Sequence, residues 1–262
     1  MTADDVTIRK ANELLRLHRD PKLLTVVNVW DVSSSRAVAG VEGTRALATA
    51  SHSIAASFGY PDGEQIPLDL MLEQVGRIVA ATDLPVTADL EGGYGDAPET
   101  VRRAIGLGVV GANIEDQLKP LPEAAAQVEA IMKVAEQEGV DFVLNARTDA
   151  YALGQGRDGD EKLADAIQRG KAFLDAGAPV VFVPAFLSER RIEALVDAFG
   201  MQRLSTIGIP GMPSLAWQEE HGVARVSYGP MPHNVALTAL QEMVEEVHRG
   251  GGVPATMRPI NL

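Results

Sequence analysis

Eight short apolar runs, each followed by a longer amphipathic segment, constrain the fold of this chain more than any other feature. The apolar runs have the length of strands buried on both faces, and the segments between them carry apolar residues at helical spacing. The runs are TVVNVW (25–30), RALATA (45–50), PVTADL (85–90), GANIED (111–116), FVLNART (142–148), PVVFVPA (179–185), RLSTIG (203–208) and ARVSYG (224–229). Eight strand-then-helix units are typical of a closed α/β barrel.

We therefore predict an α/β fold in which residues 1–262 form a single (β/α)8 TIM-type barrel, with an extra N-terminal helix near residues 7–18. A doubly wound sheet is the alternative. It needs fewer strand-helix units, and no Gly-x-Gly-x-x-Gly motif follows the first strand. The barrel is therefore the preferred fold.

The composition excludes several classes of function. A net charge of −13 argues against nucleic acids and anionic membrane surfaces as partners, because the proteins that bind them present basic faces. The chain has no cysteine, which removes disulfides, thiolate metal sites and a cysteine nucleophile. The N-terminal MTADDVTIRK lacks the apolar core of a signal peptide, and no apolar run is long enough to span a membrane, so we expect a cytoplasmic protein.

Ionisable side chains gather at the ends of three consecutive predicted strands. In an α/β barrel the active site lies at the carboxyl ends of the strands. The strand at 85–90 delivers Asp89 and Glu91 there, the strand at 111–116 delivers Glu115, and the strand at 142–148 delivers Arg147 with Asp149 close behind. The sequence therefore predicts that these groups face one site.

Three converging carboxylates repel one another unless a cation lies among them. A hard divalent ion with oxygen ligands removes that repulsion, and Mg²⁺ keeps several waters while it bridges carboxylates to a substrate. Asp89, Glu91 and Glu115 are thus candidate metal ligands, and Arg147 could bind a substrate carboxylate with two parallel hydrogen bonds. The alternatives are a solvated strand end for the acids and a structural ion pair between Arg147 and Asp149.

Five motifs together resemble those of the isocitrate lyase and phosphoenolpyruvate mutase superfamily. They are VVNVWD in the first strand, ATASHSIAASFGYPDG after the second, VTADLEGGYGD after the third, NIED on the fourth and NARTDAY on the fifth. The resemblance implies that Asp89, Glu91 and Glu115 surround Mg²⁺, with Mn²⁺ as a substitute, mostly through water. It also implies that Asp62, in GYPDG, belongs to the catalytic site.

The same resemblance implies an α-oxo or α-hydroxy carboxylate as substrate. Its carboxylate end would be received around Ser51 and His52, and Arg147 would complete the pocket. Asn28, at the end of the first strand, is a further candidate for substrate binding. Mg²⁺ can stabilise the pyruvate-type enolate that forms as a C–C or P–C bond breaks.

The sequence departs from the superfamily's pattern where the gating loop is expected. The lyases carry a catalytic Cys in a loop after the fourth strand, whereas this chain has only QLKPLP (117–122) between Asp116 and the next helix. The mutase-type Lys, Asn and Ser of that loop, and the His of the sixth strand, are also missing. Tyr94 and Lys119 are candidates for the general acid or base by position alone.

We therefore predict a Mg²⁺-dependent lyase that cleaves or decarboxylates a small α-oxo or α-hydroxy dicarboxylate. The alternatives are a protein that binds the oxo acid with little or no catalysis, and an enzyme acting on the P–C bond of a phosphonopyruvate-type substrate. A glycosidase is more distant, because only 5% of the residues are aromatic. The resemblance also implies a homo-oligomer, a dimer or tetramer, in which the last helix (HNVALTALQEMVEEV) is exchanged between subunits.

Overall fold

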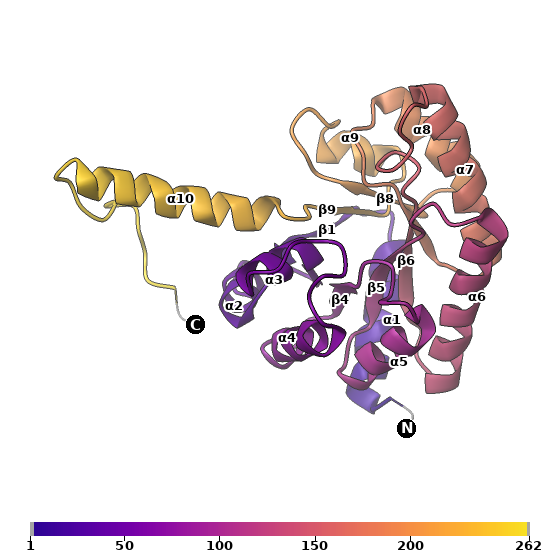
Figure 1. Ribbon diagram of the computed structural model, residues 1–262, viewed down its shortest axis with the longest axis horizontal. Helices are drawn as coiled ribbons and strands as arrows, with labels where there is room; N and C mark the ends of the chain where they lie inside the picture. The colour runs from indigo at the N-terminus through magenta and orange to yellow at the C-terminus, as the bar shows by residue number, and fades with distance from the viewer. Residues whose placement is uncertain (1–2, 261–262) are drawn as a thin grey trace.

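A computed structural model describes residues 3–260 and shows nine parallel strands surrounded by helices (Figure 1). In chain order the elements are α1 (Asp5–Arg19), β1 (Leu24–Val26), β2 (Asn28–Val29), α2 (Val32–Ala39), β3 (Leu47–Thr49), α3 (Ser51–Ser57), α4 (Leu68–Ala80), β4 (Val86–Asp89), α5 (Ala97–Gly106), β5 (Gly111–Glu115), α6 (Leu121–Glu138), β6 (Val143–Arg147), α7 (Gly159–Asp175), β7 (Val180–Phe182), α8 (Glu189–Phe199), β8 (Leu204–Ile207), α9 (Leu215–Glu220), β9 (Arg225–Ser227) and α10 (Met231–His248). The predicted α/β barrel is confirmed.

The nine strands are the eight predicted ones, because the first strand is divided in two. The strand order is β1-β9-β8-β7-β6-β5-β4-β3-β2, so β1 and β2 stand at its two ends while they follow each other in the chain. β1 pairs with β9, and β2 pairs with β3. One strand, broken at Val27, therefore joins both edges of the sheet.

Asn28 bridges the seam at which the sheet closes. Its side-chain Nδ2 donates to the carbonyl of Thr49 on β3 at 2.8 Å, and its Oδ1 accepts from the backbone N–H of Tyr228, just after β9, at 2.7 Å. The side chain is 2% exposed. A buried amide must be hydrogen-bonded, and here its two groups hold opposite edges together.

The predicted N-terminal helix is present as α1, and it packs against the barrel at the amino ends of the strands. Its Leu14 and Leu17 are buried in the core. Leu14 lies so close to Gly111, the first residue of β5, that an added Cβ there would be 2.9 Å from Leu14 Cδ2. α1 therefore lies at the foot of the barrel, the end opposite to the predicted site.

One segment of the predicted active-site loop is helical instead. The residues SHSIAAS, which contain His52, form the short helix α3 directly after β3. The N-terminal N–H of this helix, that of Ser51, donates to the side chain of Asp89. A carboxylate from the neighbouring strand thus satisfies a backbone group at the helix start, as anions do at helix N-termini.

The last helix, α10, extends away from the barrel (Figure 1). None of its residues is buried, and its exposed apolar side chains include Val235, Leu240 and Val244. Among residues 3–260, no helix is long and apolar enough to cross a membrane.

Candidate active site

The predicted acids lie at the carboxyl ends of adjacent strands. The register pairs Asp89 on β4 with Asn113 on β5, and Glu115 on β5 with Arg147 on β6. Beyond the last paired residues, the N–H of Glu115 donates to the carbonyl of Glu91 at 2.8 Å. Backbone pairing therefore brings these four side chains to one end of the barrel, where active sites of this fold lie.

Asp89 is held by the start of α3. Its Oδ2 accepts from the Ser51 hydroxyl at 2.8 Å and from the Ser51 N–H at 3.1 Å, and its own N–H donates to Thr49 Oγ1 at 2.9 Å. Ser51, which the resemblance assigned to substrate binding, thus contacts the acid of β4 in this structure. This contact fixes the orientation of the Asp89 carboxylate.

Glu91 is buried and held by two loops. Its Oε1 accepts from the hydroxyl of Tyr94 at 3.2 Å, and its Oε2 accepts from the N–H of Glu64. The Glu64 carboxylate in turn accepts from the Tyr94 N–H at 2.7 Å. These reciprocal bonds connect the loop after α3 to the loop after β4.

The backbone of these loops is strained. Six non-glycine residues within the described chain have positive φ, and five of them, namely Glu64, Glu91, Tyr94, Gln117 and Leu118, lie in loops at this end of the barrel. Such conformations cost about 1–3 kcal/mol each and gather at functional sites. The strained residues therefore lie at the same end of the barrel as the acids.

Glycines let the two loops approach each other closely. A Cβ on Gly92 would lie about 2.3 Å from Gln117 Nε2, and a Cβ on Gly93, at φ 94°, would lie 2.3 Å from Ala97 Cβ. Glycines that follow two acids at a strand end could leave room for a substrate or for neighbouring protein groups. The structure shows that Gly92 admits Gln117 and that Gly93 admits the first residue of α5.

Arg147 lies between two carboxylates. Its Nη1 is 2.7 Å from Glu115 Oε2, its Nη2 is 2.7 Å from Asp149 Oδ1, and its Nε donates to the same oxygen at 2.8 Å. The ion pair with Asp149 that the sequence left open is therefore present. The guanidinium fixes both acids and also stands at the strand end where a substrate anion would arrive.

Asp116 and Arg169 support this group from behind. Asp116 Oδ1 accepts from the N–H groups of Asp149 and Leu118, both at 3.0 Å, and its Oδ2 pairs with Arg169 Nη1 at 3.1 Å. The same Nη1 donates to the carbonyl of Lys119 at 3.0 Å. A buried arginine on α7 thus holds the short turn after β5 in place.

The acids of the site carry perturbed proton affinities. Burial raises the pKa of Glu91 to about 7, with further contributions from the charges of Asp62 and Asp89. Burial also raises the pKa of Glu115 to about 8. The positive charge of Arg147 lowers this pKa, and the charges of the nearby acids raise it again. Burial and the Glu91 charge keep Tyr94 protonated by raising its pKa. Buried like charges of this kind are typical of active sites and of ion-binding sites.

The predicted metal ligands would reach a divalent ion through water. Among residues 3–260, no three His, Asp or Glu side chains are grouped so that they could hold an ion directly. Asp89, Glu91 and Glu115 nevertheless share one end of the barrel, and two of them are hard to ionise without added positive charge. This donor set fits a hydrated cation reached through water, which is how Mg²⁺ is often held.

The remaining predicted residues occupy less central positions. Both hydrogen-bonding groups of Asn28 are used at the barrel seam. His52 is exposed on α3, and Asp62 is exposed in the loop that follows. Lys119 Nζ donates to Gln127 on α6 at 2.7 Å. Among the described residues, no hydrogen bond or ion pair joins these four side chains to the three acids, although the charge of Asp62 is near enough to Glu91 to contribute to its raised pKa.

Two residues of the site were missed by the sequence analysis. Glu64 bonds both Glu91 and Tyr94, and Arg169 bonds Asp116. Glu64 lies next to the GYPDG motif, which was a signal for that loop. Arg169 lies in the middle of an amphipathic helix, where nothing in the sequence separates it from a surface arginine.

A family model described as phosphoenolpyruvate phosphomutase matches residues 14–248, from α1 through α10. The chain belongs to the isocitrate lyase and phosphoenolpyruvate mutase superfamily. The resemblance predicted from the strand motifs is therefore confirmed. The matched residues include every strand of the barrel and the whole end that carries the acids.

Relatives within the superfamily catalyse different reactions. The isocitrate lyase of Haloferax volcanii is 30% identical over 83% of this chain and 66% of its own length. The oxaloacetate decarboxylase of Paraburkholderia xenovorans is 29% identical over 87% of this chain and 78% of its own. A crystal structure titled as a "putative phosphonomutase" from Burkholderia cenocepacia J2315 is 41% identical, with a TM-score of 0.85 over 90% of this chain and 99% of that one. Superfamily members thus include lyases of small dicarboxylates as well as mutases, and this supports an enzymatic role.

Proposed function

We propose that this protein is a Mg²⁺-dependent lyase that decarboxylates or cleaves a small α-oxo or α-hydroxy dicarboxylate through a pyruvate-type enolate. The observation that carries the proposal is the convergence of Asp89, Glu91 and Glu115 beside Arg147. When bound, the divalent ion would supply electrostatic stabilisation of the negative charge that develops on the substrate oxygen. Mn²⁺ can replace Mg²⁺ in such an oxygen-rich site.

The chain's own residues orient the charged groups. Ser51 fixes the Asp89 carboxylate, and Tyr94 donates to Glu91. Arg147, at the strand end, would receive a substrate carboxylate while Asp149 holds its guanidinium from the other side. Because these groups are oriented before substrate arrives, little reorganisation is needed during the reaction.

The short turn after β5 favours reactions that need no proton donor on the leaving group. Only residues 116–120 separate β5 from α6, and Gln117 in this turn lies against Gly92. Carbon dioxide leaves an oxo dicarboxylate without receiving a proton, so decarboxylation needs no acid from this turn. The similarity to an oxaloacetate decarboxylase also favours decarboxylation over the other cleavage reactions.

The test is turnover of a panel of oxaloacetate, alkylmalates, methylisocitrate and phosphonopyruvate with Mg²⁺ or Mn²⁺. Glu115→Gln should abolish turnover and weaken Mg²⁺ binding in a folded protein, because an amide cannot ionise to offer the ion a negatively charged oxygen. Glu123→Gln, an exposed acid on α6, is the matched control and should leave both unchanged. Equal turnover in wild type and Glu115→Gln would refute the proposal.

A second candidate is a protein that binds the oxo acid without turning it over. The short turn after β5 favours it, because the loop that carries catalytic groups in relatives is reduced there. Tight binding of oxalate or pyruvate, with no turnover of any substrate in the panel, would support this candidate. Turnover of phosphonopyruvate alone would favour the P–C bond reaction instead.

We also propose that the protein is a cytoplasmic homo-oligomer, a dimer or tetramer, in which α10 packs against another subunit. The exposed apolar side chains of this helix support the idea, because an isolated helix with an apolar face gains stability by covering it. Size-exclusion chromatography with light scattering tests it. A monomer at micromolar concentration would refute it.

A further inference from the structure

Two cavities lie at the foot of the barrel, the end opposite to Asp89, Glu91 and Glu115. Each has a volume of about 350 Å³, and both are lined by Leu15 and Arg19 of α1 and by Gly177 and Pro179 before β7. Because they share these four residues, the two cavities adjoin each other, and we call them the two branches of one cleft. The combined space is in the range of small-molecule sites.

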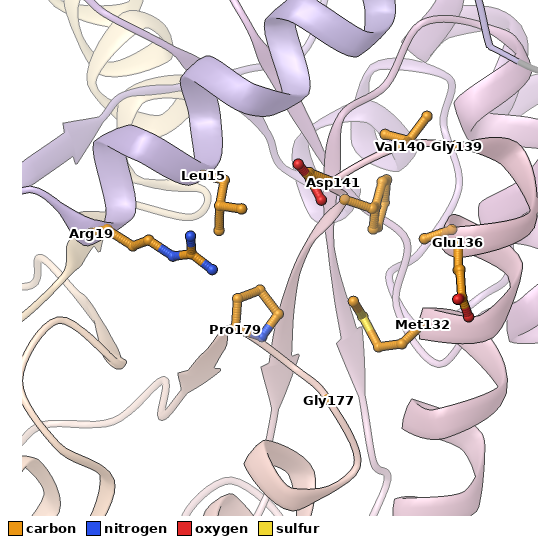
Figure 2. A pocket seen from close by; sticks show the side chains of 11 residues that line it. Leu15, Arg19, Met132, Glu136, Gly139, Val140, Asp141, Gly177 and Pro179 are labelled. Atoms are coloured by element: carbon orange, nitrogen blue, oxygen red, sulfur yellow. The ribbon is translucent and has the colours of Figure 1, made fainter.

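The first branch, the acidic branch, is completed by Asp141, Glu136 and the apolar side chains of Met132 and Phe142. Figure 2 shows the Arg19 guanidinium and the Asp141 carboxylate entering the same space from opposite walls, with Pro179 and Met132 below them. No ion pair joins Arg19 to an acid within residues 3–260. Carboxylates placed in this way can accept hydrogen bonds from ligand hydroxyl groups.

The second branch, the basic branch, contains no acid at all. It is completed by His18, Gln202 and Arg203, together with apolar and backbone groups. Like Arg19, Arg203 forms no ion pair within the described part of the chain. In a protein with a net charge of −13, two unpaired arginines on one acid-free cavity mark a local site for an anion.

His18 lines the wall of this branch with a neutral ring, and its Nε2 is not open to the cavity. Its Nδ1 is 2.8 Å from the Leu14 carbonyl, and since a carbonyl only accepts, Nδ1 carries the proton. Nε2 is therefore an acceptor, and it has no partner within residues 3–260. The ring is 1% exposed.

We propose that this cleft binds a phosphate monoester of a hydroxyl-bearing small molecule, with the phosphate in the basic branch between Arg19 and Arg203. A phosphate offers three terminal oxygens, enough for two guanidinium groups at once, whereas a single arginine fork already satisfies both oxygens of a carboxylate. The organic part extends past Arg19 into the acidic branch, where Asp141 and Glu136 accept from its hydroxyl groups.

The site is separate from the proposed lyase site, since it lies at the amino ends of the strands. If no phosphate ester binds in the cleft, the proposed lyase function is unaffected. If the protein is not a lyase, the proposal for the cleft is equally unaffected. A ligand that binds the folded state alone also stabilises it. Binding here would consequently stabilise the junction of α1 with β7 and β8.

The experiment is isothermal titration of the metal-free protein, in the presence of EDTA, with glycerol 3-phosphate and with inorganic phosphate. We expect the ester to bind with a dissociation constant below about 10 mM, and more tightly than inorganic phosphate. Arg203→Ala should weaken ester binding about tenfold, because charge-assisted hydrogen bonds are lost. Arg190→Ala removes an exposed arginine of α8 outside the cleft, and it should bind as wild type does.

Three results would overturn the proposal: no detectable binding of either phosphate, equal affinity for the ester and inorganic phosphate, or equal affinity of Arg203→Ala and Arg190→Ala. Thermal unfolding of the variants without ligand controls for folding, and exposed arginines such as Arg203 tolerate truncation well. Asp141→Asn provides an independent check. It should reduce the preference for the ester and leave inorganic phosphate binding unchanged.

Discussion

The buried ring of His18 should make the stability of this protein depend on pH in a definite direction. The ring is 1% exposed at the foot of the barrel. Burial, with a smaller contribution from the positive charge of Arg225, lowers the pKa of His18 from 6.5 to about 3. The folded protein therefore keeps this ring neutral across the ordinary range of pH.

The sign follows from comparing proton binding in the two states. Above pH 6.5 the ring is neutral in both the folded and the unfolded chain, so His18 has no effect on pH dependence there. Below pH 6.5 only the unfolded chain takes up the proton, so the free energy of unfolding falls as the pH falls toward 3. Between pH 7 and pH 4.5 this single group should remove about 2 to 3 kcal/mol of stability.

Urea unfolding at pH 7 and pH 4.5 measures the effect, with His18→Leu compared with wild type. Carboxylates contribute to acid destabilisation in both proteins and cancel in the difference. The loss of stability between the two pH values should be smaller in His18→Leu by about 2 to 3 kcal/mol.

His221→Leu is the matched control, because His221 makes the same bond to the carbonyl four residues earlier, also at 2.8 Å, but its side chain is 30% exposed. It should lose as much stability on acidification as wild type does. The reasoning is refuted if His18→Leu and wild type lose the same stability between the two pH values.

Three further predictions concern the backbone, the support of the site and the assembly. Gly93→Ala should destabilise the protein by about 3 kcal/mol or more in urea unfolding, because its Cβ would overlap α5. Gly95→Ala, with open space around its Cβ at φ 82°, should cost only about 1 kcal/mol. Arg169→Met should cost about 3–5 kcal/mol, because it leaves a buried carboxylate unpaired, and a smaller loss would mean that water reaches that acid. Leu240→Asp on α10 should reduce the oligomer size in light scattering while the control Glu242→Gln does not, and an unchanged size in both would remove α10 from the interface.

The barrel was predictable because its signal repeats along the whole chain. In a barrel of this kind each predicted strand pairs with the next one in the chain. Active sites of this fold lie at the carboxyl ends of the strands, and this places Asp89, Glu115 and Arg147 at one end. No such signal marks the break at Val27, since VVNVW reads as one continuous strand. The break depends on Asn28, whose amide must reach both β3 and the residue after β9.

Side chains that reach the site from helices and loops were not predictable in the same way. Arg169 is buried because α7 packs against the turn after β5. This contact depends on the tertiary structure, so the local sequence does not predict it. Arg225 shows the opposite case. It lies within an apolar run, and the sequence does not reveal that its guanidinium stays buried without a partner in the described chain.

The five left-handed non-glycine residues at one end of the barrel also have a consequence for evolution. Each makes the folded state less stable than an unstrained loop would, so selection for thermostability alone would replace residues such as Gln117 and Leu118 with glycine. Their presence in this chain is what we expect where activity is retained at the expense of stability. A library of variants sorted only for heat resistance should therefore gather its substitutions in these loops and lose turnover as it does so.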